Sequence, residues 1–418
     1  KDAAFFKRAF NTMQELILDN QILAGHDIGS GGLITTLLEM CFADMNLGAK
    51  IDFSVFEEKD IIKYLFAENI GIVFQAKDDA TLENKLSANN VSFYKLGTVT
   101  ADEMLNFGPC GLSIPKHRDI WFKTSFLLDQ KQSKNGTAQA RFDNYKNQAL
   151  QYTFPTHFTG KAPITSSAVE KPKAAIIREK GSNSEREMAN AMFLAGFDVK
   201  DVHMTDLISG RETLEDIQFI GAVGGFSNSD VLGSAKGWAG AFKYNEKANT
   251  ALKNFFKRED TLSVGICNGC QLFMELEMIN PEHEIHGKLL HNESHKHESI
   301  FTSVTVQENN SVMLSSLAGS TLGVWVSHGE GKFNLPMGEE NYNIVSKYAY
   351  EGYPANPNGS DYNTAMLCDK TGRHLVMMPH IERSTFQWNW AYYPKERNDE
   401  VSPWHEAFVN ARKWIDKK

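Results

Sequence analysis

The segment 263–273, SVGICNGCQLF, constrains the fold of this chain more than any other. The apolar run 261–266 predicts a buried β-strand, and it ends directly at Cys267. Gly265 and Gly269 flank the cysteine in a G-x-C-x-G pattern, which is typical of a tight turn from a strand into a helix. Such a turn strains its central residue and needs small neighbours. The segment therefore predicts an α/β fold with Cys267 at the tip of a strand.

This position suits a cysteine that acts as a nucleophile. At the N-terminus of a helix, the helix dipole stabilises the thiolate form. The backbone N–H of Asn268 would also point to the place where an oxyanion forms during attack on a carbonyl group. We therefore interpret Cys267 as a nucleophile that attacks acyl groups.

Three other interpretations of Cys267 stay open at this point. A free cysteine after a buried strand is often only a small apolar core residue. Cys267 and Cys270 form C-x-x-C and, with His291 and His295, could ligate zinc in an interaction module, although the gap from Cys270 to His291 exceeds the roughly 12–15 residues of a zinc finger. A dithiol redox site is the third interpretation, although its usual setting is a smaller fold.

A candidate base lies in the segment 374–384, HLVMMPHIERS. An apolar strand is expected to end at Pro379, and His380 and Glu382 follow. Residues two apart in an extended backbone face the same way, so Glu382 can orient the imidazole of His380 and favour its protonated form. A cysteine nucleophile needs a base of this kind, which then protonates the leaving group.

The region around these segments predicts a doubly wound, mostly parallel sheet. Strands are expected at 173–179, 197–204, 217–225 and 261–266, and they alternate with helices. Residues 181–184, GSNS, offer an N-cap to a helix over 185–195. The last helix is expected to have Ser402 as N-cap and Pro403 at its first position, and to run to Lys417.

The earlier part of the chain differs in character. With 418 residues, the chain is long enough for two or three domains of roughly 150 residues each. We expect an α/β unit over 1–125, with helices at 2–19 and 33–43 and strands within 69–77 and 94–100. Residues 126–172, polar and then rich in Pro, Thr and Ser, predict a linker with some helix, and 173–418 form the second domain. The chain starts without Met, so we expect it to be part of a longer protein.

Composition narrows the class of protein. The net charge is −9 without a block of Lys or Arg, which argues against nucleic-acid binding. No apolar run approaches the roughly 18–20 residues that span a membrane, and no leader peptide is recognisable. The five cysteines (41, 110, 267, 270 and 368) form no disulfide framework, which favours a reducing, cytoplasmic location.

The motifs in 173–384 together resemble a known family. GAVGGFSNSDVLGSAKGWA, GICNGCQLF, VWVSHGEGKF, YPANPNGS and MMPHIERS are similar to the class I glutamine amidotransferases. The match is closest to the large, single-chain phosphoribosylformylglycinamidine synthases of purine biosynthesis, which are ligases that use glutamine as the amido donor.

The resemblance implies roles for further residues. The loop at Gly224-Gly225 would supply a second oxyanion N–H from Gly225, and Gln271 would contact glutamine. Ser327, His328 and Gly329 would line the glutamine pocket. The family commonly has Tyr-Gly where this chain has Asn228-Ser229, so Ser229 carries strain if that glycine serves a positive φ.

The resemblance extends to the N-terminal part. HDIGSGGL (26–33) is similar to the C-terminal domain of aminoimidazole ribonucleotide synthetase, here an α+β half-domain. Gly29 stands where the family has Ser, so no hydroxyl contact is expected there. The glycines at 31 and 32 offer either a backbone cradle for phosphate or only a plain turn, and both interpretations stay open. His26 and Asp27 can equally have a purely structural role.

The function implied is the hydrolysis of glutamine by Cys267, His380 and Glu382. The ammonia would serve the ATP-dependent conversion of formylglycinamide ribonucleotide to formylglycinamidine ribonucleotide. ATP and Mg²⁺ are expected in the full-length enzyme at sites mostly upstream, in synthetase domains missing here, and no cofactor or metal is expected for the glutaminase step. This chain alone is then at best a glutaminase, without nucleic-acid or membrane partners.

Alternatives to this function also remain. One is a stand-alone cysteine hydrolase of the same fold, such as a γ-glutamyl peptidase, although that function needs no synthetase-like half-domain. The others are the zinc-binding interaction module and a scaffold that has lost activity.

Overall fold

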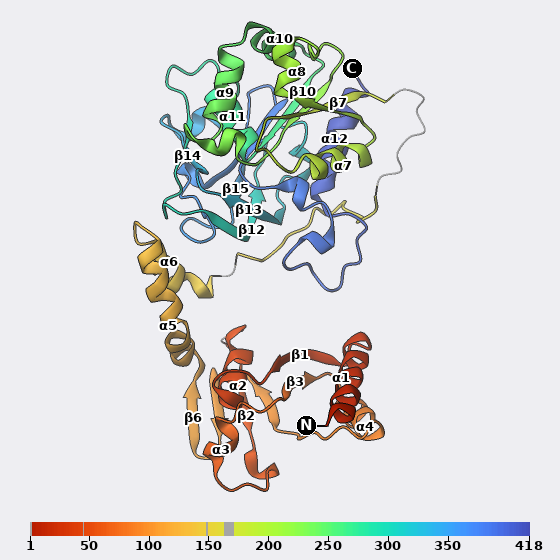
Figure 1. Cartoon of the computed structure of the whole chain (residues 1–418), viewed down its shortest axis with the longest axis vertical. Helices are drawn as coiled ribbons and strands as arrows, with labels where there is room; N and C mark the ends of the chain where they lie inside the picture. Colours follow the sequence, from red (N-terminus) through yellow and green to blue (C-terminus); the bar gives the residue numbers. More distant parts are fainter. Residues whose placement is uncertain (1, 45, 148, 163–170) are drawn as a thin grey trace. The chain divides into compact units, whose positions relative to one another are not determined.

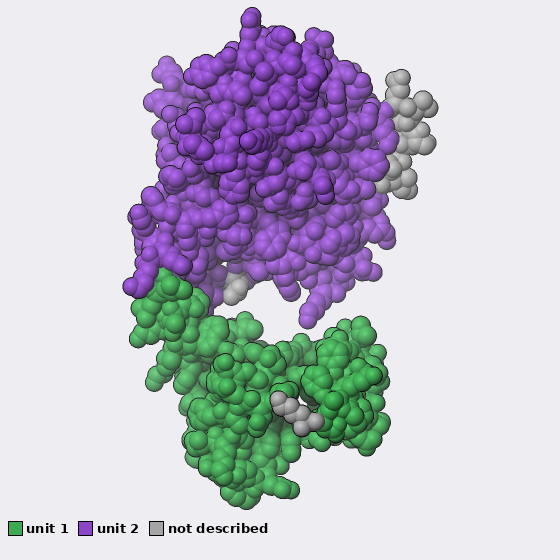
Figure 2. All heavy atoms as spheres, viewed as in Figure 1, with its two compact units in different colours: residues 1–128 green, residues 129–418 purple. Residues whose placement is uncertain are grey.

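The computed structural model describes residues 2–44, 46–147, 149–162 and 171–418. Residue contacts divide the chain into unit 1, Lys1–Leu128, and unit 2, Asp129–Lys418 (Figure 2). Helix α5, Ile114–Gln132, contains the boundary between them. The predicted limits of the linker, 126–172, stay a prediction, and its residues 148 and 163–170 lie outside the described part of the chain.

Unit 1 combines two small sheets with helices (Figure 1). One sheet has the order β1-β3 and the other has the order β4-β2-β5-β6. Its elements before α5 are α1 (Ala3–Leu18), β1 (Ile22–Asp27), α2 (Gly32–Phe42), β2 (Gly48–Ile51), α3 (Ile61–Leu65), β3 (Ile72–Ala76), α4 (Asp79–Ala88), β4 (Gly97–Thr100), β5 (Met104–Phe107) and β6 (Cys110–Ser113).

The helices and strands that we predicted in unit 1 are present in the structure. The helices expected at 2–19 and 33–43 are α1 and α2, and the strands expected within 69–77 and 94–100 are β3 and β4. Helix α1 begins where the Asp2 carboxylate accepts a hydrogen bond of 3.0 Å from the N–H of Phe5. Leu16 on α1 and Leu86 on α4 are buried together in a small core.

Unit 2 is built around a nine-stranded sheet with the order β13-β12-β15-β16-β17-β10-β9-β7-β8. A further pair, β11-β14, stands apart from it. The elements of unit 2 are α6 (Thr137–Asp143), β7 (Lys173–Arg178), α7 (Glu185–Leu194), β8 (Asp198–His203), α8 (Met204–Ser209), β9 (Phe219–Ala222), α9 (Lys236–Lys243), α10 (Glu246–Lys257), β10 (Leu262–Ile266), α11 (Asn268–Glu275), β11 (Lys288–Leu290), β12 (Glu298–Val306), β13 (Thr321–His328), β14 (Lys332–Asn334), β15 (Asn343–Tyr348), β16 (Thr364–Cys368), β17 (His374–Met377) and α12 (Trp404–Ile415).

The predicted α/β fold class is confirmed. Strands β17, β10, β9, β7 and β8 pair in parallel, as expected from the alternation of strands and helices. Helices α7 and α12 pack together, and α8 to α11 form a second group, so that helices cover both faces of this half of the sheet (Figure 1). Every residue of β9 and of β10 is buried, which explains their continuous apolar sequences.

The other half of the sheet is antiparallel, a feature that the sequence did not predict. β13, β12, β15, β16 and β17 pair antiparallel in that order. An isolated antiparallel bridge then links Trp325 on β13 to His380, just beyond β17, through a hydrogen bond of 2.8 Å from the His380 N–H to the Trp325 carbonyl. The first and last strands of this half therefore meet again at His380.

Two predicted helix caps are wrong. Ser184 precedes α7 in a left-handed conformation, φ 70°, and its side chain makes no capping hydrogen bond. At the last helix, Pro403 rather than Ser402 occupies the N-cap position, and the helix ends at Ile415. The Ser402 hydroxyl still accepts a hydrogen bond of 3.3 Å from the Trp404 N–H, so this prediction missed by one position.

Candidate active site

The candidate site lies where three neighbouring parallel strands end. β9, β10 and β17 lie side by side in the sheet, and their carboxyl ends lead to Gly224, Cys267 and His380 respectively. Ligands of open α/β sheets bind at this edge, because the loops that leave the strands there form a crevice. The order of the strands thus gathers residues that are far apart in the sequence.

Cys267 occupies the strained turn that its sequence predicts. It follows β10 and caps α11 with φ 53° and ψ −107°, a conformation that costs an L-residue about 1–3 kcal/mol. Both glycines are needed for close packing. A Cβ on Gly265 would lie 2.6 Å from the carbonyl oxygen of Gly269, and a Cβ on Gly269 would overlap the carbonyl oxygen of Ala222. The sulfur lies 3.8 Å from the Ser327 carbonyl oxygen.

His380 lies beside Cys267 and is oriented by Glu382. A Cβ on Gly224 would lie 2.8 Å from Cε1 of His380 and 3.3 Å from Cβ of Cys267, so both side chains flank one glycine. Nδ1 of His380 is 2.7 Å from Oε1 of Glu382, and both residues are buried. The backbone differs from our expectation, because β17 ends at Met377 and a 3-10 turn, Ile381–Arg383, follows His380. The turn, not an extended strand, brings the carboxylate to the ring.

The surroundings favour a charged histidine. Burial alone lowers the pKa of His380, but the charge of Glu382 and hydrogen bonds with Cys267 and Glu382 outweigh burial and raise it to about 10. Burial opposes ionisation of Glu382 in the same way, yet the charge of His380 holds its pKa below the usual value. The pair therefore favours imidazolium next to carboxylate.

Two backbone amides belong to residues close to Cys267, because Asn268 follows it in the chain and Gly225 lines the same cavity. Asn268 is the first residue of α11, so its N–H lacks an acceptor within the helix. Gly225, with φ 121°, forms an isolated β-bridge with Ser182. The hydrogen bonds of this bridge are made by the carbonyl of Gly224 and by the N–H of Phe226, so the N–H of Gly225 is not used in it. These amides can stabilise an oxyanion next to Cys267.

A cavity of ≈ 40 Å³ adjoins Cys267. Seven of the residues that we predicted from the sequence line it, namely Gly225, Cys267, Gln271, Ser327, His328, Gly329 and His380. Glu382 and Asn268 stand behind it. The Asn268 side chain accepts from the Ser227 N–H at 3.1 Å and donates to Gln271 at 2.9 Å, which ties the loop after β9 to α11.

The turn 327–331 forms one wall of the cavity. Its Glu330 carbonyl accepts a hydrogen bond of 2.6 Å from the Gln271 side chain. The His328 ring is buried and neither of its nitrogens has a partner among the described residues. Burial, with smaller contributions from His380 and His297, holds the pKa of His328 well below its usual value, so this ring is neutral.

Five further residues line the cavity that the sequence did not reveal: Asn183, Phe226, Asp230, Ser234 and Arg383. Burial raises the pKa of Asp230, and hydrogen bonds from Ala235, Ser234 and Asn268 partly offset this effect. Loop 226–234 follows a central strand, and this position was the one feature of the sequence that could have indicated its residues as part of the site. Ser229 has φ 57°, so the condition that we gave for strain at that position is met.

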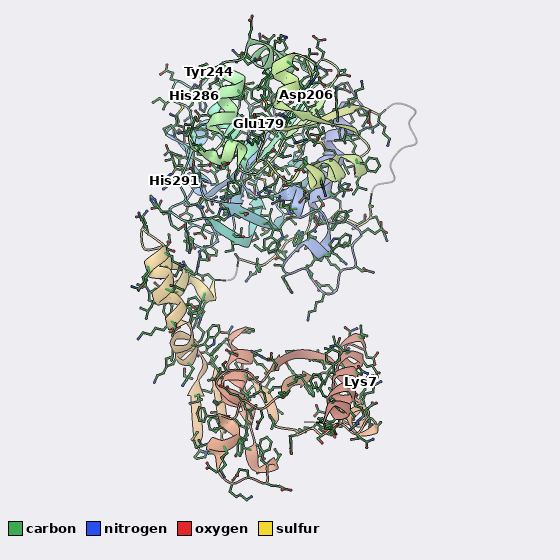
Figure 3. The ribbon with its side chains drawn as sticks, viewed as in Figure 1. Lys7, Glu179, Asp206, Tyr244, His286 and His291 are labelled. Atoms are coloured by element: carbon green, nitrogen blue, oxygen red, sulfur yellow. The ribbon has the colours of Figure 1, made fainter. Side chains whose placement is uncertain are left out.

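The zinc and dithiol interpretations find no support in the geometry. Cys270 is fully buried on α11, and burial followed by the charge of Cys267 raises the pKa of its thiol well above the usual value. His291 projects from the loop after β11 (Figure 3), and its ring stacks on His295 and faces Glu330 at 3.7 Å. Within the described residues, no group of three or more His, Cys, Asp or Glu side chains could hold a metal ion.

In unit 1, the structure favours a plain turn at Gly31 and Gly32 over a phosphate cradle. The Gly31 N–H donates to the Glu68 carboxylate at 2.9 Å, and the Gly32 N–H donates to the Gly29 carbonyl at 3.0 Å. Both amides therefore have acceptors within the protein. Nε2 of His26 lies 2.9 Å from the Glu39 carboxylate. We assign no ATP or Mg²⁺ contact to this turn.

Comparisons with known proteins identify two domain families in this chain. The profile of the CobB/CobQ-like glutamine amidotransferase domain matches residues 171–415, and that of the C-terminal domain of AIR synthase related proteins matches residues 1–108. None of the described helices is both long and apolar enough to cross a membrane.

Two curated relatives cover nearly the whole chain. A probable phosphoribosylformylglycinamidine synthase of Arabidopsis thaliana, named as chloroplastic/mitochondrial, is 38% identical over 448 residues, 99% of this chain and 31% of that protein. The phosphoribosylformylglycinamidine synthase of Homo sapiens is 36% identical over 445 residues, 97% of this chain and 33% of that protein. The chain thus spans about a third of the length of these relatives.

Among solved structures, PurLQS from Thermotoga maritima is similar, with a TM-score of 0.45 and 23% identity, over 59% of this chain and 99% of that chain. The profile match covers more than half of the residues and includes every side chain of the cavity. The chain therefore belongs to the family of CobB/CobQ-like glutamine amidotransferase domains.

Proposed function

We propose that unit 2 hydrolyses glutamine to glutamate and ammonia, with Cys267 as nucleophile and His380, oriented by Glu382, as general base and acid. One observation carries the proposal. A strained strand-to-helix turn presents Cys267 next to His380, whose Nδ1 lies 2.7 Å from the buried Glu382 carboxylate. This is the arrangement that a thiol nucleophile requires.

In the first half of the reaction, the Cys267 thiolate attacks the side-chain amide carbon of glutamine. The amides of Asn268 and Gly225 hold the oxyanion, and each such donor contributes on the order of 3 kcal/mol. His380 gives its proton to the departing nitrogen, which leaves as ammonia, and a γ-glutamyl thioester remains on Cys267.

In the second half, water hydrolyses the thioester. His380, now neutral, accepts a proton from water as the oxygen attacks the carbonyl carbon. The same two amides hold the second oxyanion. Collapse of this intermediate releases glutamate and restores the thiolate and imidazolium pair.

The cavity also offers groups for the other end of glutamine. Gln271 and the turn from Ser327 to Gly329 would contact the substrate. Asp230 and Arg383 carry the charges that an α-ammonium and an α-carboxylate require. A space of ≈ 40 Å³ holds a few water molecules rather than glutamine.

The test measures glutamate release from glutamine for the intact chain, for Cys267→Ala and for Cys270→Ala. We expect Cys267→Ala to abolish release. Cys270→Ala is the matched control, because it removes a buried thiol from the same helix and should leave the reaction in place. Wild-type activity in Cys267→Ala would refute the proposal.

A second measurement covers the case in which the chain alone turns over slowly. Diazo-oxo-norleucine, a glutamine-like electrophile, should label Cys267 in a single event, detected by mass spectrometry of the peptide. Glutamine should slow the labelling. Labelling elsewhere, or labelling that glutamine leaves unaffected, would count against a glutamine site.

We further propose that the ammonia serves the reaction for which the relatives are named. In the full-length protein, ATP would activate the amide oxygen of formylglycinamide ribonucleotide, and ammonia would displace it to give formylglycinamidine ribonucleotide, ADP and phosphate. Because the AIR synthase related profile matches residues 1–108, a stand-alone hydrolase is disfavoured. A full-length Cys267→Ala protein should then accept ammonium salts but not glutamine.

Three finer assignments remain part of the proposal. ATP and Mg²⁺ would bind in parts of the full-length protein outside this chain. The domains would be 1–125, 126–172 as linker and 173–418. The cytoplasmic location also stays a prediction, since the name of the plant relative points to organelles. Fractionation of cells with an antibody against this chain tests the location.

A further inference from the structure

The turn 327–331 is held from outside the cavity by one side chain. Asn292 is fully buried, and its Oδ1 accepts a hydrogen bond of 2.9 Å from the Gly331 N–H. Its Nδ2 donates to the His328 carbonyl at 2.6 Å and to the Lys296 carbonyl at 3.0 Å. One amide group therefore spans the turn from His328 to Gly331 and also fixes its own loop.

Other contacts from the same loop support this arrangement. The Asn292 N–H donates to the Gly329 carbonyl at 2.9 Å, so both the backbone and the side chain of this residue hold the turn. His297 lies 3.1 Å from the Ser327 hydroxyl, and Lys332 forms an ion pair of 2.5 Å with Glu293. Loop 291–297 thus follows the outer side of the turn along its length.

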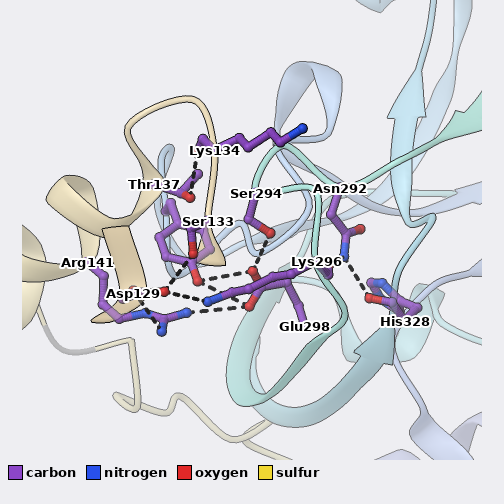
Figure 4. A network of polar contacts seen from close by, with 11 residues as sticks. Asp129, Ser133, Lys134, Thr137, Arg141, Asn292, Ser294, Lys296, Glu298 and His328 are labelled. Atoms are coloured by element: carbon purple, nitrogen blue, oxygen red, sulfur yellow. Dashed lines mark hydrogen bonds and ion pairs between the residues drawn. The ribbon is translucent and has the colours of Figure 1, made fainter. Parts of the chain in front are cut away.

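The loop is in turn anchored to α5 and α6 by a network of charges (Figure 4). Lys296 forms an ion pair of 2.7 Å with Asp129, which also contacts Arg141 at 3.2 Å. Arg141 lies 3.5 Å from Glu298, and Glu298 accepts hydrogen bonds of 3.1 Å from the Tyr353 hydroxyl.

The two carboxylates of this network are poorly hydrated, so each depends on its partners. The Glu298 side chain is 4% exposed and that of Asp129 is 11% exposed. Removing one partner of such a set leaves a buried charge without compensation and displaces the chain that carries it. Lys296, whose carbonyl also binds Asn292, is therefore the link between the helices and the turn.

We infer that Asn292 is a positioning residue for the glutamine pocket, and that the network of Asp129, Arg141, Lys296 and Glu298 holds it in place. The inference rests on the glutaminase function proposed above. Asn292 does not line the cavity, so it acts through the backbone of 327–331. A supporting residue of this kind sets the precision of the groups that touch substrate. Its loss should weaken glutamine recognition and spare the reactivity of Cys267.

The experiment compares two labels of Cys267 in the intact chain. Diazo-oxo-norleucine needs the glutamine pocket, whereas iodoacetamide needs only the thiolate. For Asn292→Ala, we expect the concentration of diazo-oxo-norleucine that gives half-maximal labelling rate to rise about tenfold or more, since a buried carbonyl and amide lose their partner. The rate of labelling by iodoacetamide should stay within about twofold of wild type.

Matched variants separate positioning from general damage. Asn309→Ala is the control, because Asn309 also holds a turn through its side chain. The Asn309 amide donates to the Gln307 carbonyl at 2.7 Å and accepts from the Ser311 N–H at 2.9 Å. This turn follows the C-terminal end of β12, whereas Asn292 precedes its N-terminal end. Asn309→Ala should change neither label. Lys296→Met should weaken diazo-oxo-norleucine labelling as Asn292→Ala does, and Lys296→Arg should restore it by keeping the ion pair with Asp129.

The outcomes are distinct. The positioning role would be overturned if the concentration of diazo-oxo-norleucine for half-maximal labelling were unchanged in Asn292→Ala. It would also be overturned if labelling by diazo-oxo-norleucine and by iodoacetamide weakened equally. If wild-type Cys267 reacts with iodoacetamide but not with diazo-oxo-norleucine, the glutaminase function itself fails and the inference fails with it.

Discussion

At the scale of single residues, the candidate site depends on how burial and charge act together on His380. Burial by itself would keep the ring neutral, and a neutral ring cannot protonate the nitrogen that leaves. Glu382 reverses this balance from behind the ring, without touching the cavity. The carboxylate therefore controls the charge of the base.

The variant Glu382→Gln tests this control. It keeps the size of the side chain and removes its charge, so burial should gain weight and the pKa of His380 should fall below about 10, with Cys267 as the remaining neighbour that raises it. Nuclear magnetic resonance of labelled histidine, followed against pH, measures the change. A His380 pKa that stays near 10 in the variant would show that another group sets the charge.

The same pair predicts how stability depends on pH. Because the folded-state pKa of His380 is raised, the pair stabilises the fold fully below pH 6.5 and loses this contribution as pH rises through about 10. The free energy of unfolding, from urea titrations, should therefore differ most between wild type and Glu382→Gln near pH 6, where Glu382 is also ionised. The difference should shrink towards pH 10.

The sequence revealed some residues of the site and hid others for physical reasons. Cys267 was recognisable because a strained turn demands glycines on both sides, and His380 with Glu382 because the two are neighbours in sequence. Asp230 and Arg383 were missed, because any loop can carry a charged residue and only the order of strands brings these loops to the cavity.

At the scale of elements, the site depends on the close approach of α11 to β9. Gly269 lies against the Ala222 carbonyl, and this contact sets the distance from the helix start to the strand. The N–H of Asn268 belongs to the same turn of helix. A helix that moved away from β9 would move this donor with it.

Gly269→Ala should therefore destabilise unit 2 by at least about 2 kcal/mol, because the added methyl group overlaps backbone atoms that cannot yield. Gly240→Ala is the control. It also lies in a helix, α9, where an added Cβ would come no closer than 3.9 Å to another atom. The control should be neutral or stabilising by about 0.5–1 kcal/mol. Thermal unfolding monitored by circular dichroism distinguishes the two variants.

Predictions about elements succeeded where one local pattern was sufficient. Apolar runs between glycines and polar residues identified β9 and β10, because a strand covered on both faces needs such a run. The antiparallel half of the sheet was missed, because the pairing of β12, β13, β15 and β16 depends on contacts distant in sequence. Ser184 failed as a cap because the chain enters α7 through a left-handed conformation.

At the scale of the whole molecule, unit 2 contains its own core. The buried side chains of the large core cluster all belong to residues between Ala174 and Ile415. The partly buried side chains that pack against this cluster all belong to residues after 149. The fragment 129–418 should therefore fold without unit 1 and keep the reactivity of Cys267.

A shorter fragment, 144–418, provides the comparison. It retains the core but lacks Asp129 and Arg141, so Lys296 loses its ion pair with Asp129 and Glu298 loses its ion pair with Arg141. We expect both fragments to unfold cooperatively, and only the shorter one to bind diazo-oxo-norleucine weakly. Failure of 129–418 to fold would mean that unit 2 depends on unit 1 for stability.

The bridge between Trp325 and His380 has a mechanical consequence. Because it joins the first antiparallel strand to the residue that follows the last one, five strands form a ring through their main chains. The peptide of the base is thus tied directly to the strand that carries the pocket wall. A displacement of this strand is therefore transmitted through a main-chain hydrogen bond to the backbone of His380.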